Sequence, residues 1–231
     1  EPVESDPLKR VDLDGVMFSE ISGNILVTRY VDDKPRRYFR DKALEADYHW
    51  LESKLPGREI NISSRSDDDQ ILLISASSDV EPGEVYLFNR KGRKLDFQYK
   101  VREKVPREAL SQMRTVRYKS SDGLEIPASL TLPKGLPEKN FPVVVFPHGG
   151  PWARDHWGYN PIHQFLANRG YAVLSPNFRA STGFGKKFLN AGNGEWGRKM
   201  QDDITWGVRY LVDQGTADPK RVAIMGGSYG G

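Results

Sequence analysis

One short stretch of the sequence has the residue types that a nucleophilic serine needs. Residues Gly226–Gly230 read GGSYG and match the pattern G-x-S-x-G. In this pattern the serine lies on a sharp turn between a strand and a helix, so its neighbours must be small and its hydroxyl is left exposed. The apolar run RVAIMG leads directly into the motif and supplies the expected strand. We therefore predict that Ser228 is a catalytic nucleophile; the alternative is a glycine-rich turn whose serine has no chemical role.

A second loop of small residues could stabilise the negative charge that attack by a serine creates. The loop PHGGP, Pro147–Pro151, follows the apolar run FPVVVF. Backbone N–H groups aimed at the developing oxyanion lower the barrier to acyl transfer. In α/β hydrolases one donor is the residue after the nucleophile, here Tyr229, and the other lies in an H-G-G loop after an earlier strand. The sequence predicts Gly150 as this second donor, with a simple glycine turn as the alternative.

His148 lies in the same loop, but its place in the chain argues against a role as the catalytic base. In an α/β hydrolase the base and the acid of the triad both follow the serine. We therefore interpret His148 as a hydrogen-bonding residue of the loop. Asp202 and Asp203 also precede Ser228, so neither fits the triad acid.

The sequence gives no reason to expect a cofactor, a metal, nucleic acid or a membrane. GNGEWG at Gly192–Gly197 matches G-x-G-x-x-G, but no buried strand leads into it, as a nucleotide site would require. The chain has no cysteine, its net charge is only +3 and its basic residues are scattered. No apolar run approaches the roughly 20 residues of a membrane-spanning helix. The other histidines lack the spacing typical of a metal site; they are His49, His156 and His163.

The second half of the sequence, residues 111–231, alternates between strands and helices around these motifs. Continuous apolar runs predict buried strands, and a 3.6-residue apolar period after Glu195 predicts a helix. This alternation indicates an α/β domain, with a parallel sheet and helices on both faces, that ends at the serine turn. The elements expected are a hairpin at Thr115–Pro133, strands in Phe141–Gly150, Tyr171–Asn177 and Arg221–Gly226, and helices at His163–Gly170 and Glu195–Gly215.

The first half, residues 1–110, has a different pattern of apolar and turn-forming residues. Short runs of β-branched and aromatic residues alternate with turn-forming residues, which predicts an all-β segment of a sandwich, barrel or propeller. No long helix is expected, beyond a turn or two near Lys42–Leu55. The predicted strands are Asn24–Tyr30, Arg36–Phe39, Gln70–Ser77 and Glu84–Arg90.

Four motifs taken together resemble the prolyl oligopeptidase family of serine peptidases, nearest to its acylaminoacyl peptidase and dipeptidyl peptidase branch. The resemblance covers about Arg114–Gly231 and implies a β-propeller joined to an α/β-hydrolase domain that cleaves short peptides. It also implies an acyl-enzyme on Ser228, an oxyanion hole from the N–H groups of Tyr229 and Gly150, and structural roles for Arg179 and Gly183. The four motifs are HGGP at 148–151, SPNFRASTGFGKKF at 175–188, GEWGRKMQDD at 194–203 and GGSYGG at 226–231.

Compared with that family, the sequence is expected to be an internal piece of a longer peptidase, cut at both ends. A propeller needs at least about four blades of some 45 residues, and residues 1–110 would supply only the end of one. The triad acid and histidine would follow Ser228, so we expect these 231 residues alone to be inactive. The family includes both monomers and higher assemblies, so the resemblance is compatible with a homo-oligomer. Two alternatives stay open: a carboxylesterase of the same fold, and a non-catalytic propeller module with an inactive hydrolase domain.

Overall fold

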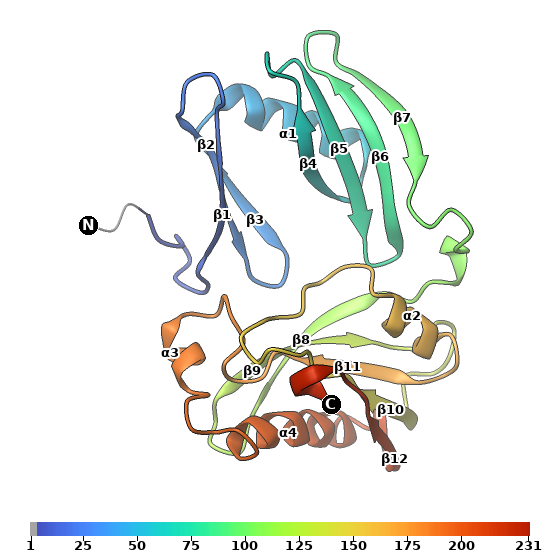
Figure 1. Cartoon of the computed structure of the whole chain (residues 1–231). Helices are drawn as coiled ribbons and strands as arrows, with labels where there is room; N and C mark the ends of the chain where they lie inside the picture. The colour runs from blue at the N-terminus through green and yellow to red at the C-terminus, as the bar shows by residue number, and fades with distance from the viewer. Residues whose placement is uncertain (1–3) are drawn as a thin grey trace.

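The computed structural model describes residues 4–231. Its first half contains two open antiparallel sheets that stand above the second half (Figure 1). The first sheet has the order β1-β2-β3 and the second has the order β4-β5-β6-β7. Neither sheet closes on itself within the described residues, so the expected end of a propeller is not confirmed. The strands are β1 (Leu13–Phe18), β2 (Ile25–Val31), β3 (Pro35–Phe39), β4 (Glu59–Arg65), β5 (Ile71–Ser78), β6 (Glu81–Asn89) and β7 (Lys94–Lys100).

A helix of 13 residues, α1 (Lys42–Lys54), lies between the two sheets in the sequence. The expectation of an all-β segment with at most a turn or two here was therefore wrong. Asp41 caps the helix by accepting a hydrogen bond from the Leu44 amide at 2.7 Å. Leu44, Tyr48 and Leu51 follow the helical period and are buried in a core shared with β2, β4, β5 and β6. This packing stabilises the helix more than its mixed sequence does.

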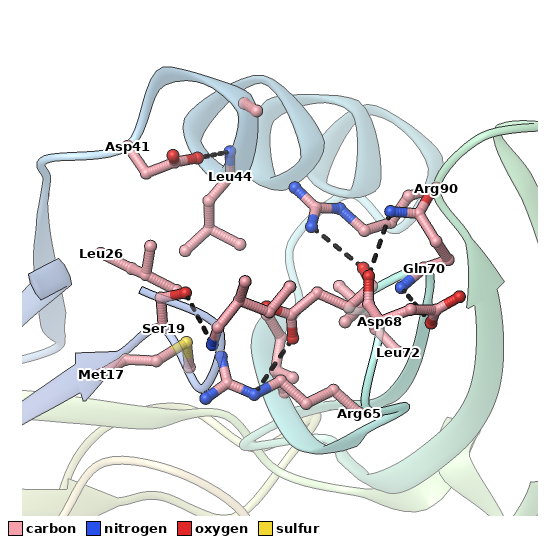
Figure 2. A pocket seen from close by; sticks show the side chains of 14 residues that line it. Met17, Ser19, Leu26, Asp41, Leu44, Arg65, Asp68, Gln70, Leu72 and Arg90 are labelled. Atoms are coloured by element: carbon pink, nitrogen blue, oxygen red, sulfur yellow. Dashed lines mark hydrogen bonds and ion pairs between the residues drawn. The ribbon is translucent and has the colours of Figure 1, made fainter. Parts of the chain in front are cut away.

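A cavity of about 250 Å³ marks the seam between the two sheets (Figure 2). Two arginines of its polar wall already bind other groups of the protein. Arg65 donates from Nη2 to the Phe18 carbonyl at 2.6 Å and pairs through Nε with Asp69 at 3.2 Å. Arg90 donates from Nη1 to the Asp69 carbonyl at 3.0 Å. All lining residues fall between Met17 and Arg90, so the cavity belongs to the first half alone.

The second half is built on a five-stranded sheet with the order β12-β10-β11-β9-β8. Strands β12, β10 and β11 are parallel, whereas β9 runs antiparallel to β11 and β8 runs antiparallel to β9. The sheet is therefore mixed and not wholly parallel, because the predicted hairpin pairs with its edge instead of standing apart. The strands are β8 (Met113–Lys119), β9 (Glu125–Thr131), β10 (Phe141–Val145), β11 (Ala172–Pro176) and β12 (Ala217–Ile224).

Two helices cover opposite faces of this sheet, as expected. His163 of α2 (Pro161–Ala167) contacts Ser175 of β11, and the preceding Leu174 lies beneath Gly207 of α4 (Lys199–Asp213). Successive residues of a strand point to opposite faces, so α2 and α4 lie on different sides. Figure 1 shows α4 beneath the sheet.

The helix expected from Glu195 is shorter than its apolar pattern suggested. It begins at Lys199, and Trp196 lies outside it with 57% of its surface exposed. Met200, Ile204 and Leu211 are buried as the pattern predicted. A further short helix, α3 (Lys186–Asn190), was not predicted. None of the helices among residues 4–231 is long and apolar enough to cross a membrane.

The segment that leads into β1 is tied to the second half. The Asp12 amide donates to the Gly183 carbonyl at 3.0 Å, and the Gly185 amide donates back to the Asp12 carboxylate at 3.0 Å. The second bond joins residues 173 positions apart, and both bonds reach the loop before α3. The two halves are therefore linked through main-chain groups as well as through side chains.

Candidate active site

Ser228 lies on a tight turn directly after the edge strand β12. The strand ends at Ile224, and the Met225 amide still donates to the Val145 carbonyl of β10 at 2.9 Å. Ser228 then has a φ of +57°, a left-handed conformation that costs a residue with a side chain about 1 kcal/mol or more. It opens the short 3-10 helix η2 (Ser228–Gly230) and is exposed. The structure thus has the strand, strained turn and helix that the motif predicts.

Two glycines of this turn, Gly226 and Gly230, leave no room for side chains. A Cβ added to Gly226 would lie 2.0 Å from the Gly230 carbonyl oxygen. A Cβ added to Gly230 would lie 2.2 Å from the Pro147 carbonyl oxygen of the PHGGP loop. Both distances are far below van der Waals contact, so the turn and the loop can approach only because both positions are glycine.

The PHGGP loop reaches the serine because it follows β10, the parallel neighbour of β12. Parallel neighbours end at the same edge of a sheet, which brings their following loops together. A Cβ added to Gly149 would lie 3.0 Å from the Gly227 carbonyl oxygen and 3.8 Å from the Ser228 hydroxyl oxygen. Gly150 follows with a φ of +131°. The structure therefore places the Gly149 backbone beside Ser228, and the predicted donor Gly150 is the next residue in the loop.

The His148 side chain forms hydrogen bonds that fix the backbone of its own loop. Its Nδ1 donates to the Gly149 carbonyl oxygen at 2.7 Å, and its Nε2 forms a hydrogen bond of 2.8 Å with the Ser181 hydroxyl. The imidazole also stacks on Phe178, with ring centres 4.5 Å apart. Both ring nitrogens are therefore engaged by the scaffold, as expected of a structural residue.

The two predicted oxyanion donors are backbone amides near this serine. The Gly150 amide has no hydrogen-bond acceptor among the residues that the structure describes. The Tyr229 amide lies in the first turn of η2, where amides lack partners within the helix. The Tyr229 ring is fixed by contacts with Trp196 and Phe178, at centre distances of 5.2 and 5.7 Å. Free amides on a rigid backbone are the groups that stabilise an oxyanion.

Comparisons with known proteins agree with this geometry. Residues 157–231 match the model of the prolyl oligopeptidase family. The chain is 39% identical over 231 residues to dipeptidyl aminopeptidase BIII of Pseudoxanthomonas mexicana, an alignment that covers 96% of this chain. It is 35% identical over 244 residues to dipeptidyl peptidase family member 6 of Caenorhabditis elegans, also covering 96%. The chain belongs to the prolyl oligopeptidase family.

The chain spans about a third of the length of these two relatives of the prolyl oligopeptidase family, 33% in each case. Its fold is also found in solved structures. A prolyl endopeptidase matches 96% of this chain with a TM-score of 0.71 and 23% identity, and the alignment covers 32% of that protein. The acylaminoacyl peptidase of Pyrococcus horikoshii matches 96% with a TM-score of 0.66 and 23% identity, covering 34% of that protein.

Arg179, which follows β11, and Asp203 of α4 form a buried ion pair in this member of the prolyl oligopeptidase family. The Asp203 carboxylate is fully buried and accepts hydrogen bonds from the Arg179 amide, Nε and Nη2 at 2.9, 2.9 and 2.7 Å. Arg179 also donates to Asp122, and this contact lowers the pKa of the Asp122 carboxyl well below its usual range. The position of Asp203 fits its exclusion as a triad acid, and Arg179 links the loop after β11 to α4.

Two of the remaining histidines bind other parts of the chain. His163 is fully buried between Thr131 and Ser175, with hydrogen bonds of 3.0 and 2.7 Å, and burial lowers its pKa to about 4. His49 is exposed and faces Glu52 on α1. Among residues 4–231, no group of three or more histidines and carboxylates is arranged to hold a metal ion.

Sequence reasoning did not single out Trp152 or Arg154, although both follow the predicted oxyanion loop. Trp152 is 59% exposed, and its ring lies 6.1 Å from that of Trp196. Arg154 is largely buried and contacts the first half of the chain. Their closeness in sequence to Gly150 was the only available signal, since their partners are distant along the chain.

Proposed function

We propose that the protein containing this chain is a serine peptidase that hydrolyses short peptides through an acyl-enzyme on Ser228. The observation that carries this proposal is the strained, exposed Ser228 with the Gly149–Gly150 backbone packed against it. Family membership and the peptidase names of the relatives support it. In this proposal residues 111–231 form part of an α/β-hydrolase domain, and residues 1–110 form part of a propeller-like domain that restricts access to the site.

The reaction follows from the placement of these groups. The Ser228 hydroxyl oxygen attacks the carbonyl carbon of the scissile peptide bond, and its proton passes to a general base. The carbonyl oxygen becomes an oxyanion that accepts hydrogen bonds from the amides of Gly150 and Tyr229. Collapse of this intermediate expels the amine, which takes up the proton, and leaves an ester on Ser228. Water then hydrolyses the ester by the same steps and regenerates the hydroxyl.

The base and its carboxylate partner belong after the serine in the chain order of this fold. A neutral serine hydroxyl without a base is a poor nucleophile, and loss of a triad member costs several orders of magnitude in rate. We therefore expect the 231 residues without these partners to hydrolyse peptides at a negligible rate. Turnover of a peptide anilide by the isolated 231 residues at the rate of the full-length protein would contradict this expectation.

A fluorophosphonate probe tests the proposed nucleophile. We expect the full-length protein to gain one adduct that maps to Ser228, and the Ser228→Ala variant to gain none. Hydrolysis of short peptide amides in addition to simple esters would distinguish a peptidase from a carboxylesterase. A wild-type protein that folds but does not react with the probe would refute the proposal and favour a non-catalytic role.

A further inference from the structure

Two arginines from different elements of the second half hold the same turn of the first half. The turn connects β2 to β3. Arg154 donates from Nη1 to the Val31 carbonyl at 2.9 Å and from Nη2 to the Asp32 carbonyl at 3.1 Å. Arg117, on β8, donates from Nη2 to the carboxylates of Asp32 and Asp33 at 2.6 and 2.8 Å. Only Arg154 lies in the segment that continues from the PHGGP loop.

Arg154 is held in an unusual way for a buried cation. Its guanidinium lies 4.1 Å from the centre of the Phe184 ring, and a Cβ at Gly183 would come within 2.7 Å of Nη1. Its hydrogen bonds go to main-chain carbonyls, no carboxylate among residues 4–231 lies within ion-pair distance of it, and its Nε has no hydrogen-bond partner there. Burial lowers the pKa of the guanidinium. The attraction of the Asp14, Asp32 and Asp33 carboxylates offsets part of this effect. A buried cation without a paired carboxylate recovers less of its desolvation cost than a paired one, so Arg154 stabilises docking of the two halves less than an ion pair would.

A tight turn connects Arg154 to the proposed oxyanion donor. The Ala153 amide donates to the Pro151 carbonyl at 2.9 Å. A Cβ added to Gly150 would lie 2.7 Å from the Trp152 amide nitrogen, so the backbone folds closely back on itself here. Only three residues separate Arg154 from Gly150, and their backbone is tightly turned. A displacement of Arg154 should therefore also displace Gly150.

We propose that Arg154 is a positioning residue that sets the place of the Gly150 N–H while bound to the β2–β3 turn. The oxyanion site is then complete only when the strand-rich half is docked on the second half. This inference rests on the proposed function, because the role of Gly150 as a donor is part of that function. It adds a route by which the first half controls the chemistry without contacting the substrate.

The test compares Arg154→Ala with Arg117→Ala in the full-length protein. Both variants remove a contact to the same turn, but only Arg154 is connected to Gly150. Loss of one oxyanion donor costs about 10²–10³-fold in rate, and a displaced donor costs part of that. We expect phosphonylation of Ser228 by a fluorophosphonate to slow by roughly 10–100-fold in Arg154→Ala, with peptide KM within about threefold of wild type. Arg117→Ala should slow it by less than about threefold.

Equal slowing in the two variants would overturn the proposal, because it would show that docking alone matters. No slowing in Arg154→Ala would overturn it as well. Arg154→Lys keeps the charge but cannot bind both carbonyls. We expect this variant to fold and to be phosphonylated at a rate between those of Arg154→Ala and wild type.

Hydrogen exchange of the amides of Gly149, Gly150, Trp152 and Ala153 separates this proposal from the proposed function. We expect faster exchange there in Arg154→Ala than in Arg117→Ala, whatever the chemistry of Ser228. Unchanged exchange would refute the link between Arg154 and the loop. A wild-type protein that does not react with the fluorophosphonate would instead refute the proposed function.

Discussion

Nδ1 of His148 donates to the carbonyl oxygen of Gly149, and that carbonyl belongs to the same peptide unit as the N–H of Gly150. In a trans peptide the carbonyl and the N–H point in opposite directions. Holding the carbonyl on the side of the imidazole therefore directs the N–H to the other side. Since His148 is itself anchored to Ser181 and Phe178, its imidazole ties the carbonyl side of this peptide unit to the core of the second half.

Removal of this imidazole should weaken catalysis more than folding. In His148→Ala the Gly149 carbonyl loses its donor and the peptide unit can rotate, so we expect kcat/KM for a short peptide to fall by about 10²-fold. The measurement is steady-state kinetics on the full-length protein. His49→Ala, which removes an exposed histidine of α1, serves as the control and should leave the rate unchanged. A loss of similar size in both variants would contradict this account.

The glycines of the serine turn should differ sharply in their tolerance of a methyl group. Gly226→Ala places a Cβ against the Gly230 carbonyl and should abolish labelling of Ser228 by a fluorophosphonate. Gly227→Ala is the matched control, because a Cβ there meets no atom within 4 Å and φ is −130°. We expect it to keep labelling within about threefold of wild type. Loss of labelling in both variants would show that the turn is sensitive for another reason.

The buried pair of Arg179 and Asp203 should be important for stability. Asp203→Asn leaves the Arg179 guanidinium without its main carboxylate, which typically costs about 3–5 kcal/mol for a buried pair. The exposed pair of Arg114 and Glu138 is the control, and Glu138→Gln should cost less than about 1 kcal/mol. Thermal unfolding of both variants tests the difference. Equal changes in Tm would show that the buried Arg179 pair contributes no more to stability than the exposed pair does.

His163 should make the second half less stable in acid. Its pKa is about 4 in the folded protein, against 6.5 as its ordinary value. The unfolded chain therefore binds more protons between these values, and the free energy of unfolding falls as the pH drops from about 6.5 to 4, by up to about 3 kcal/mol. Above pH 6.5 the histidine is neutral in both the folded and the unfolded protein, so the free energy of unfolding shows no loss from this group.

A titration of Tm against pH tests this. His163→Gln cannot be protonated, so the difference in Tm between wild type and variant should shrink as the pH falls through this window. A difference that stays constant from pH 7 to pH 4 would show that His163 is not the responsible group.

The parts of the structure that follow from short sequence patterns were the easiest to predict. The Ser228 turn and the Gly149–Gly150 loop depend on a few neighbouring residues, and the structure brings them together. The helix α1 was missed because its apolar residues are few and its charged residues many, so it owes its stability to packing against two sheets. The strand β7, LDFQYK after Lys94, was missed although Leu95, Phe97 and Tyr99 alternate with polar residues; it is a largely exposed edge strand that follows directly on the charged turn RKGRK.

Contacts between distant residues were beyond the reach of sequence patterns. Arg154 binds Val31 at a separation of 123 positions, and nothing in either neighbourhood indicates the other. The antiparallel pairing of β9 with β11 likewise depends on the whole second half. Such contacts arise from the packing of complete elements, and local propensity does not encode them.

The bonds between Asp12 and the loop at Gly183–Gly185 have a consequence for synthesis on the ribosome. The segment before β1 cannot gain these partners until Gly185, 173 residues later, has been made and has left the exit tunnel. At about 5–20 residues per second this delay is roughly 10–35 s. During that time the residues just before β1 lack both of these hydrogen bonds, so this part of the first half can reach its final state only after most of the second half has been made.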